Sequence, residues 1–301
     1  MKSKKPFGIM LTILGLLIGV TFLSLSPNSK GSMAKFFNLP QQVASVKLDK
    51  KFDFAGEPVP LNEDTYERLD RELNVNAYWQ SSTLLHLKLA YKYFPEVEKI
   101  LQREGVPDDF KYLAVAESGL RNPTSGSRAK GYWQFMKGTA SELNLEWNQD
   151  VDERMHLEKS TLAACQYIKQ LHERFGTWTD AAGAYNVGPT AYAKALIEQK
   201  ENSYYNLNVN DETSRYVFRI IAFKEILSNP TDFGFYIEDY EKYMPHPSLK
   251  EIVVTENIQS LADFAHQFGT TYRLLKYYNP WLINNKLDVP PGKSYTIKIP
   301  S

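Results

Sequence analysis

The chain has 301 residues, 43% of them hydrophobic, and its 35 Lys and Arg residues balance its 35 Asp and Glu residues. This length allows about two domains, and the apolar content is high enough for packed cores, which excludes a largely disordered chain. A net charge of zero gives no support for nucleic-acid binding, which usually requires a basic surface. The single cysteine, Cys165, excludes an intrachain disulfide and a four-cysteine zinc site, and we interpret it as a small buried residue.

The N-terminal 26 residues have the pattern of an export signal or a membrane anchor. Three lysines within the first five residues precede an apolar run at residues 7–25, close to the ~20 residues that span a bilayer. Pro27 would follow a cut made at the end of this run, so we interpret residues 1–26 as an uncleaved anchor, with a cleaved signal peptide as the alternative. The lysines precede the run, which places the rest of the chain outside the cytoplasmic membrane, on the periplasmic side.

Residues 27–61 are polar, rich in turn-forming residues and interrupted by prolines, a composition typical of a tether. From residue 62 to residue 228 the pattern is helical throughout, which predicts an all-α domain. Asn62 is a suitable N-cap for the first helix, because two acidic residues follow it in the first turn. Further helices are predicted at residues 81–94 and 95–104.

Apolar periodicity predicts two later helices, and the pattern then changes. One stripe follows the spacing i, i+3, i+4, i+7, i+11, at Ala164, Tyr167, Ile168, Leu171 and Phe175. A last helix is predicted after Asn210. The proline-rich residues 229–250 indicate a connector. Residues 251–301 then combine strand, helix, helix and strand patterns, which predicts a small α+β module that folds independently.

The helix before Gly119 carries a carboxylate on its apolar face. Phe110, Leu113 and Ala114 form the apolar stripe, and Glu117 lies seven residues after Phe110 on the same face. Burial and a position in the last helical turn both disfavour negative charge, so both raise the pKa of a carboxyl group. A general acid near neutral pH requires such a raised pKa. The alternatives are a buried glutamate paired with an arginine and an exposed glutamate at a frayed helix end.

Four short motifs occur in order along the chain. They are Glu-Ser-Gly-Leu at residues 117–120, Gly-Tyr-Trp-Gln-Phe-Met at 131–136, Ala-Tyr-Asn-Val-Gly-Pro at 184–189 and Glu-Thr-Ser-Arg-Tyr-Val at 212–217. Each motif is weak alone, but four in this order and approximate spacing are specific. Together they resemble the soluble-lytic-transglycosylase family, most closely its membrane-bound type D branch, over about residues 52–228.

The resemblance implies a goose-lysozyme-like helical fold with a cleft for the β-1,4-linked MurNAc–GlcNAc strands of peptidoglycan. It implies that Glu117 is the catalytic acid and that Ser118 steadies the bound sugar and the developing intermediate. The other implied site residues are Gln134 as a substrate contact, Tyr185 and Asn186 as lining of the cleft, and Tyr216 as a hydrogen-bond partner near the acid.

Structural roles compete with some of these assignments. We expect Trp133, Phe135 and Met136 to belong to the core rather than to the cleft. The alternative for Tyr185 is a core tyrosine with a satisfied hydroxyl, and the alternative for Asn186 is a helix C-cap. The chain also departs from the family's usual residues, with glycine at 183 in place of alanine and lysine at 137 in place of proline, at positions that carry no chemistry.

The implied reaction uses one acid. Glu117 would protonate the glycosidic oxygen and then accept the proton of the MurNAc 6-hydroxyl, which attacks C1 and forms a 1,6-anhydro end. Most glycosidases use a second carboxylate. Asp152, Glu153 and Asp180 could supply one, but we interpret Asp152 and Glu153 as turn residues and Asp180 as a helix-start residue. A goose-type lysozyme, which is a hydrolase, and a non-catalytic peptidoglycan-binding scaffold are the alternative functions. No motif indicates a metal, nucleotide or organic cofactor.

Residues 251–301 resemble a LysM domain, a βααβ carbohydrate-binding module. The matching segments are Ser-Leu at 260–261, Phe-Ala at 264–265, Phe-Gly-Thr-Thr at 268–271, Asn-Pro-Trp-Leu at 279–282 and Ile-Lys-Ile-Pro at 297–300. The family's common Gly-Asp-Thr segment is replaced by Glu-Asn-Ile at 256–258, in a loop that borders the sugar groove in the family. A module that only packs on the catalytic domain is therefore the alternative to a glycan-binding one.

The interpretation of the N-terminus as an anchor can be tested directly. We expect residues 7–25 to remain on the mature protein and to hold it on the outer face of the cytoplasmic membrane, because Pro27 disfavours cleavage there. N-terminal sequencing of the protein from membrane and soluble fractions should find the uncut sequence in the membrane fraction. A soluble species that begins near residue 27 would show that the segment is a cleaved signal peptide.

Overall fold

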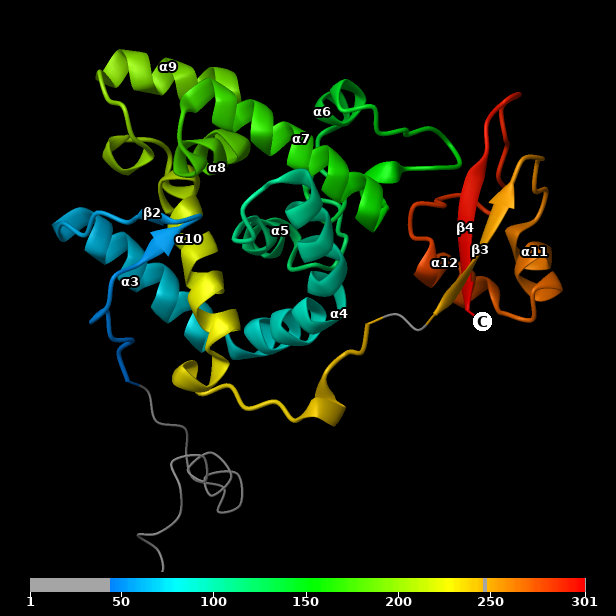
Figure 1. Cartoon of the computed structure of the whole chain (residues 1–301), viewed down its shortest axis with the longest axis horizontal. Coiled ribbons are helices and arrows are strands. Elements are labelled where there is room, and N and C mark those ends of the chain that lie inside the picture. The colour runs from blue at the N-terminus through cyan, green and yellow to red at the C-terminus, as the bar shows by residue number, and fades with distance from the viewer. Residues whose placement is uncertain (1–43, 246–247, 301) are drawn as a thin grey trace, which may run out of the picture. The chain divides into compact units, whose positions relative to one another are not determined.

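The computed structural model of the chain describes residues 44–245 and 248–300 (Figure 1). Residues from 46 onward form one compact unit. The predicted anchor at residues 1–26 and most of the predicted tether lie outside the described residues. Across the described ranges, no helix is long and apolar enough to cross a membrane.

A short hairpin lies at the start of this unit. Strands β1 (Asp53–Phe54) and β2 (Glu57–Pro58) pair in antiparallel fashion. The ring of Phe54 is fully buried and lies edge-on to Phe110, with ring centroids 5.1 Å apart. Part of the segment that we assigned to the tether from its composition therefore contributes side chains to the core.

The first long helix begins where the sequence predicts. Helix α3 (Glu63–Tyr78) is capped by Asn62, whose Oδ1 accepts a hydrogen bond of 2.9 Å from the Thr65 backbone N–H. The Thr65 hydroxyl in turn accepts one of 2.9 Å from the Asn62 N–H, so the two residues form a reciprocal capping box. The acidic residues of the first turn face the positive end of the helix dipole, which stabilises this helix start.

Helix α4 (Gln80–Glu104) is continuous, so the prediction of two helices divided at Pro95 is wrong. Proline lacks an N–H and leaves the Tyr91 carbonyl without its usual helical donor, which normally weakens a helix. Tertiary packing outweighs this loss, because Ala90 before the proline and Val97 after it are buried in the same core. The helix therefore survives through burial rather than through its local sequence.

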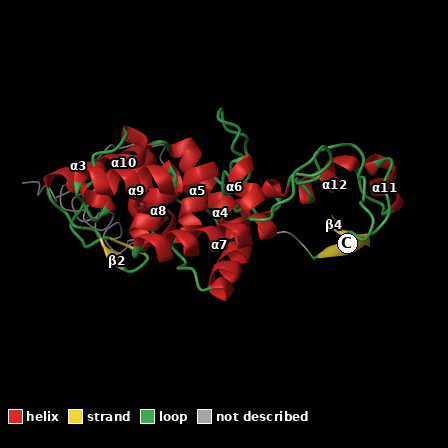
Figure 2. Cartoon of the chain, turned by 90° about the horizontal axis from the view of Figure 1, so that it is seen from above, coloured by secondary structure: helices red, strands yellow, loops and turns green. Residues whose placement is uncertain are grey.

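Helix α5 (Phe110–Ser118) packs against both α4 and α10 (Asp211–Ser228). Helix α10 begins after Asn210 as predicted, and Asn210 is its N-cap, since its Oδ1 accepts a hydrogen bond of 2.9 Å from the Thr213 N–H. The other elements of this part are α6 (Lys137–Glu142), α7 (Leu157–Phe175), α8 (Trp178–Val187) and α9 (Pro189–Gln199), with 3₁₀ turns at Glu153–Met155, Tyr204–Asn206, Pro230–Phe233 and Asp239–Glu241. Figure 2 shows helices as the main elements of the described chain, and the mainly helical fold class is confirmed.

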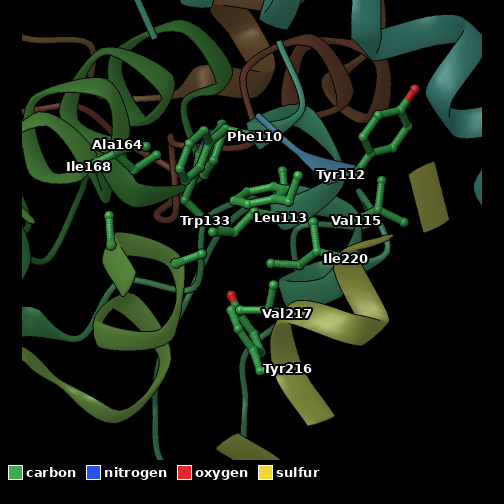
Figure 3. Close-up of a cluster of buried hydrophobic side chains, with 14 of the residues drawn as sticks. Phe110, Tyr112, Leu113, Val115, Trp133, Ala164, Ile168, Tyr216, Val217 and Ile220 are labelled. Atoms are coloured by element: carbon green, nitrogen blue, oxygen red, sulfur yellow. The ribbon is translucent and has the colours of Figure 1, made fainter. Parts of the chain in front are cut away.

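The core of the helical part surrounds α5. Figure 3 shows Phe110 and Leu113 of α5 close to Trp133, with Ile168 from α7 and Val217 from α10 completing the cluster. All of these side chains are buried. The apolar stripe predicted on α7 is confirmed by the burial of its central residues. The apolar face of α5 is thus buried in the core of the helical part.

The C-terminal module has the predicted strand, helix, helix, strand order. Strand β3 (Leu249–Val254) is followed by α11 (Leu261–Gln267) and α12 (Tyr272–Tyr278), and the chain returns as β4 (Tyr295–Pro300). The two strands pair in antiparallel register, with Ile252 opposite Ile297. Among the described residues, the only sheets are this pair and the β1–β2 hairpin. The βααβ prediction is confirmed.

Two glycines of the helical part occupy positions that leave no room for a side chain. Gly131 has φ of 91°, and a Cβ there would lie 1.8 Å from the carbonyl oxygen of Arg154. A Cβ on Gly183, in α8, would lie 2.7 Å from the ring of Tyr204 and 3.0 Å from that of Tyr192. Close ring packing against α8 therefore explains why glycine replaces the family's usual alanine at position 183.

The Gly131 contact predicts a large effect of a small substitution. Gly131→Ala should lower the free energy of unfolding by more than about 3 kcal/mol, because a methyl group would collide with backbone and the φ value is unfavourable for alanine. Gly138→Ala is the matched control, since Gly138 lies in α6 and faces open space. It should raise stability by about 0.5–1 kcal/mol. Urea unfolding measures both, and equal stability of the two variants would contradict this account.

Candidate active site

Glu117 lies in the last turn of α5, and its carboxylate meets the hydroxyl of Tyr216 from α10. The Tyr216 hydroxyl donates a short hydrogen bond to Glu117 Oε1. Tyr216 is buried, whereas Glu117 is half-buried. Two residues that are 99 positions apart in the sequence are therefore in direct contact, as the resemblance implied for a tyrosine near the acid.

The surroundings of Glu117 favour its protonated form. Burial raises the pKa of Glu117 to about 7, and the negative charge of Glu212 acts in the same direction. The hydrogen bond from Tyr216 and the positive charge of Arg219 act against this rise, but burial dominates. A carboxyl group with a pKa near 7 can donate a proton at neutral pH and accept one back.

The alternative of a buried ion pair does not describe Glu117. Within the described ranges, no basic side chain forms a salt bridge with Glu117. The two arginines of α10 instead pair with Glu72 of α3, since Arg215 Nη1 and Arg219 Nε each lie 3.3 Å from a carboxylate oxygen of Glu72. Glu72 is only 2% exposed, so its charge is satisfied by these two partners. The two helices α3 and α10 are tied together next to Tyr216.

Ser118 makes its hydrogen bonds to the backbone. Its Oγ lies 2.8 Å from the Tyr132 carbonyl oxygen and 3.0 Å from that of Ala114, and it accepts a bond of 3.0 Å from the Leu120 N–H. These contacts hold the turn after α5 against the segment that begins at Gly131. The role of Ser118 towards a sugar stays a prediction.

Tyr185 approaches the same segment from α8. Its hydroxyl donates a bond of 2.7 Å to the Trp133 carbonyl oxygen. Burial raises the pKa of Tyr185 well above its usual range, and the charge of Glu117 adds to this effect. The ring lies beside Phe135 and Tyr167, with centroids 6.1 and 5.4 Å away. Tyr185 is therefore a neutral, half-buried tyrosine close enough to Glu117 to sense its charge.

Gln134 has a left-handed backbone conformation, with φ of 50°. Its Nε2 donates bonds of 2.7 Å to the Gly131 carbonyl and 3.1 Å to the Pro123 carbonyl. A non-glycine residue with positive φ is uncommon and persists only where the surroundings hold it. The side chain is half-buried. Its position beside Trp133 places it on the segment that Ser118 and Tyr185 both contact.

Asn186 is linked to α10 instead of capping α8. Its Oδ1 accepts a bond of 2.9 Å from the Thr213 hydroxyl, and Gly188 is the residue that ends the helix. The C-cap interpretation of Asn186 is therefore wrong. The prediction that Met136 belongs to the core is also wrong, because it is 47% exposed where the chain enters α6. Trp133 is buried as expected, and its indole N–H donates to the Thr161 hydroxyl.

The three other carboxylates considered from the sequence have structural partners. Asp152 pairs with Arg154 at 2.8 Å, and Glu153 accepts a bond of 2.9 Å from the Glu146 N–H. Asp180 accepts one of 2.7 Å from the Tyr204 N–H. All three are buried. These contacts agree with the structural interpretation of the three residues.

Glu212 and Arg219 were given no role from the sequence. Both act on the charge of Glu117. A sequence pattern could have indicated Glu212, since it precedes Tyr216 by four residues and lies one helical turn away on the same face. Arg219 follows Tyr216 by three residues and is on that face for the same reason.

Comparison with known protein families agrees with this architecture. Residues 96–208 match the model of the transglycosylase SLT domain, and residues 250–301 match that of the soluble lytic transglycosylase C-terminal LysM-like domain. The chain thus carries an SLT transglycosylase domain followed by a C-terminal LysM-like domain, and the resemblance described from the motifs is confirmed.

Two curated relatives extend the comparison. The chain is 27% identical over 225 residues to the membrane-bound lytic murein transglycosylase D of Escherichia coli strain K12, a match that covers 70% of this chain and 49% of the relative. The protein of the same name from Escherichia coli O6:H1 matches equally. The chain therefore spans about half the length of the curated relatives it matches.

The raised pKa of Glu117 predicts a stability change with pH. The folded protein holds this proton up to about pH 7, whereas the unfolded chain releases it near 4.5. The stability that the folded protein gains by keeping the Glu117 proton is complete below about pH 4.5 and is lost as the pH rises through 7. Glu117→Gln has no such loss, so it should gain stability relative to the native protein between pH 5 and pH 8, on the order of 1–3 kcal/mol.

Thermal melting of both proteins at pH 5 and pH 8 measures this difference. Glu67→Gln is the control, because Glu67 is an exposed residue of α3 that undergoes the same chemical change. If Glu117→Gln shows the same melting difference from the native protein at both pH values, the carboxyl group has an ordinary pKa.

Proposed function

We propose that this chain is a peptidoglycan lytic transglycosylase that uses Glu117 as its single acid and base. The observation that carries the proposal is the desolvated Glu117 carboxyl, whose pKa is raised to about 7 and which is held by the Tyr216 hydroxyl. The SLT domain match and the similarity to a lytic murein transglycosylase support the same activity. The substrate proposed is the β-1,4 bond between MurNAc and GlcNAc.

The proposed reaction starts from protonated Glu117. Its proton passes to the glycosidic oxygen, so the GlcNAc side leaves as an alcohol while positive charge develops at C1 of MurNAc. The N-acetyl group of MurNAc assists this step. The Glu117 carboxylate then takes the proton of the MurNAc 6-hydroxyl, and that oxygen attacks C1. A 1,6-anhydro end forms, the acid is regenerated and no water is consumed.

Each neighbouring residue has a proposed part in this cycle. Tyr216 orients the carboxylate and stabilises its charged form after proton transfer, since a hydrogen bond to a carboxylate favours that form. Glu212 acts in the opposite sense and keeps the proton on Glu117 before substrate binds. Ser118 and Tyr185 hold the backbone at residues 132 and 133 and so place Gln134 as a substrate contact. Asn186 lines the same region.

We also propose boundaries and a location. The catalytic domain covers residues 52–228 rather than 62–228, because Phe54 of the hairpin belongs to its core. The connector is at 229–250 and the LysM-like module at 251–301. The name of the relatives includes the term membrane-bound, which supports attachment through residues 1–26 on the periplasmic side. Peptidoglycan strands are the proposed partner of both domains.

Two other functions remain to be separated from this one. A goose-type lysozyme would hydrolyse the same bond with water and would need a second base. Asp152, Glu153 and Asp180 are engaged with other protein groups, which favours a mechanism without a second carboxylate. A non-catalytic scaffold would have no use for a half-buried carboxyl group with a raised pKa, because it lowers stability above pH 7.

Digestion of purified sacculi, with mass spectrometry of the released fragments, tests the proposal. The native protein should release fragments with 1,6-anhydro ends, and Glu117→Gln should lower the rate by at least about 10²–10⁴-fold, because it removes the transferable proton. Glu67→Gln should act like the native protein. Reducing ends would identify a hydrolase, and no release by the native protein would identify a scaffold. A folded Glu117→Gln protein with nearly native release would exclude Glu117 as the catalyst.

A further inference from the structure

The chain between α6 and α7 reaches into the C-terminal module. We call residues 146–154 the crossing segment. Its Val151 is fully buried within the hydrophobic core of the module, next to Leu282. The backbone joins the two parts as well, since Asp152 N–H donates to the Trp281 carbonyl and Ile283 N–H donates to the Asp150 carbonyl, both at 2.8 Å.

Two carboxylates strengthen this junction. Asp150 is 6% exposed, and its oxygens accept bonds of 2.7 Å from Asn284 Nδ2 and 2.9 Å from the Asp288 N–H. Glu146 accepts a bond of 2.9 Å from the Tyr295 hydroxyl. A buried carboxylate is costly unless it is well bonded, and bonds to a charged acceptor are stronger than neutral ones. The module is therefore attached through specific contacts on the crossing segment.

The other end of the crossing segment supports the loop that carries Gln134. Arg154 is 1% exposed, and its guanidinium bonds to both oxygens of Asp152, at 2.9 and 2.8 Å. The same guanidinium donates to the Phe135 carbonyl at 3.1 Å and to the Arg128 carbonyl at 3.3 Å. A buried arginine with these partners is fixed in position.

The loop at residues 128–135 is consequently held by contacts from the crossing segment, α5 and α8. The backbone of Arg154 lies directly against Gly131, where no side chain fits. From α5 and α8, Ser118 and Tyr185 bond to the carbonyls of Tyr132 and Trp133. The left-handed backbone of Gln134, with φ of 50°, lies between these supports. Such a conformation persists where its surroundings over-determine it.

We propose that the C-terminal module acts as a positioning element for the active site. In this role Asp150 and Arg154 are positioning residues. The module binds Asp150, and the crossing segment connects Asp150 to Arg154. Arg154 in turn holds the loop that presents Gln134. This inference rests on the proposed function for its catalytic consequence, but the mechanical link itself does not depend on any activity. The module then has a second task besides any binding of glycan.

Hydrogen–deuterium exchange of the full chain tests the mechanical link. Asp150→Ala should speed exchange about 10-fold or more at residues 281–284 and, through the crossing segment, at residues 131–135, while α3 and α10 keep native protection. Asp288→Ala is the matched control, because it removes a side chain that pairs with Lys286 on the surface of the module and keeps the Asp288 N–H that bonds to Asp150. Asp150→Asn keeps one acceptor and should give an intermediate result.

Activity on soluble glycan strands gives the second readout. Asp150→Ala should lower kcat/KM by about 10-fold or more, because even a small misplacement of a substrate contact slows the reaction. The thermal melting of the helical part should stay unchanged. Asn284→Ala, which removes one donor to Asp150 from the module side, should act in the same direction and guards against a local misfolding of the Asp150 variant.

Two results would overturn the positioning role. Exchange at residues 281–284 that stays native in Asp150→Ala would show that Asp150 does not hold the junction. Faster exchange at residues 281–284 together with native protection at residues 131–135 would show that the junction does not affect the conformation of the loop. Native kcat/KM in the same variant would lead to the same conclusion. A native protein that releases no glycan would instead refute the proposed function, while the exchange data would still decide the mechanical link.

Discussion

The contact between the Glu117 carboxylate and the Tyr216 hydroxyl is the interaction on which the site depends. Helix α5 carries the carboxylate on its apolar face, so packing α5 against α10 partly removes that group from water. Desolvation raises the free energy of the charged form, and one hydrogen bond from a neutral tyrosine recovers only part of it. The result is a carboxyl group with a pKa near 7, raised mainly by desolvation and further by the negative charge of Glu212.

The loop between α5 and α6 links this acid to the rest of the molecule. Ser118 contacts it from α5, Tyr185 from α8 and Arg154 from the crossing segment. Each of these bonds ends on a backbone carbonyl, and the Gln134 side chain adds its own bonds to the Gly131 and Pro123 carbonyls, so supports from other elements and the loop's own side chain fix its conformation together. Gln134 therefore retains a backbone conformation that is unfavourable for an isolated residue.

The junction changes how the C-terminal module is understood. A proline-rich connector and a separate α+β pattern are typical of a domain that moves independently. In the structure Val151 of the helical part is instead buried in the core of the module, and Asp150 satisfies donors from it. The composition of a connector describes only the covalent link between two domains. It does not predict contacts that other segments of the chain make between the same two domains.

Local patterns in the sequence determined the helical class, the cap at Asn62, the start of a helix after Asn210, the βααβ order and the position of Glu117 on an apolar stripe. Each of these follows from residues within a few turns of one another, where periodicity and capping chemistry act directly. Only the tertiary structure decided the continuity of α4 through Pro95, the exposure of Met136 and the burial of Phe54. The tertiary structure also decided which charges surround Glu117 and how Asp150 joins the two parts, because these contacts link residues about 100 or more positions apart. Packing between such distant segments leaves no periodic pattern in the sequence.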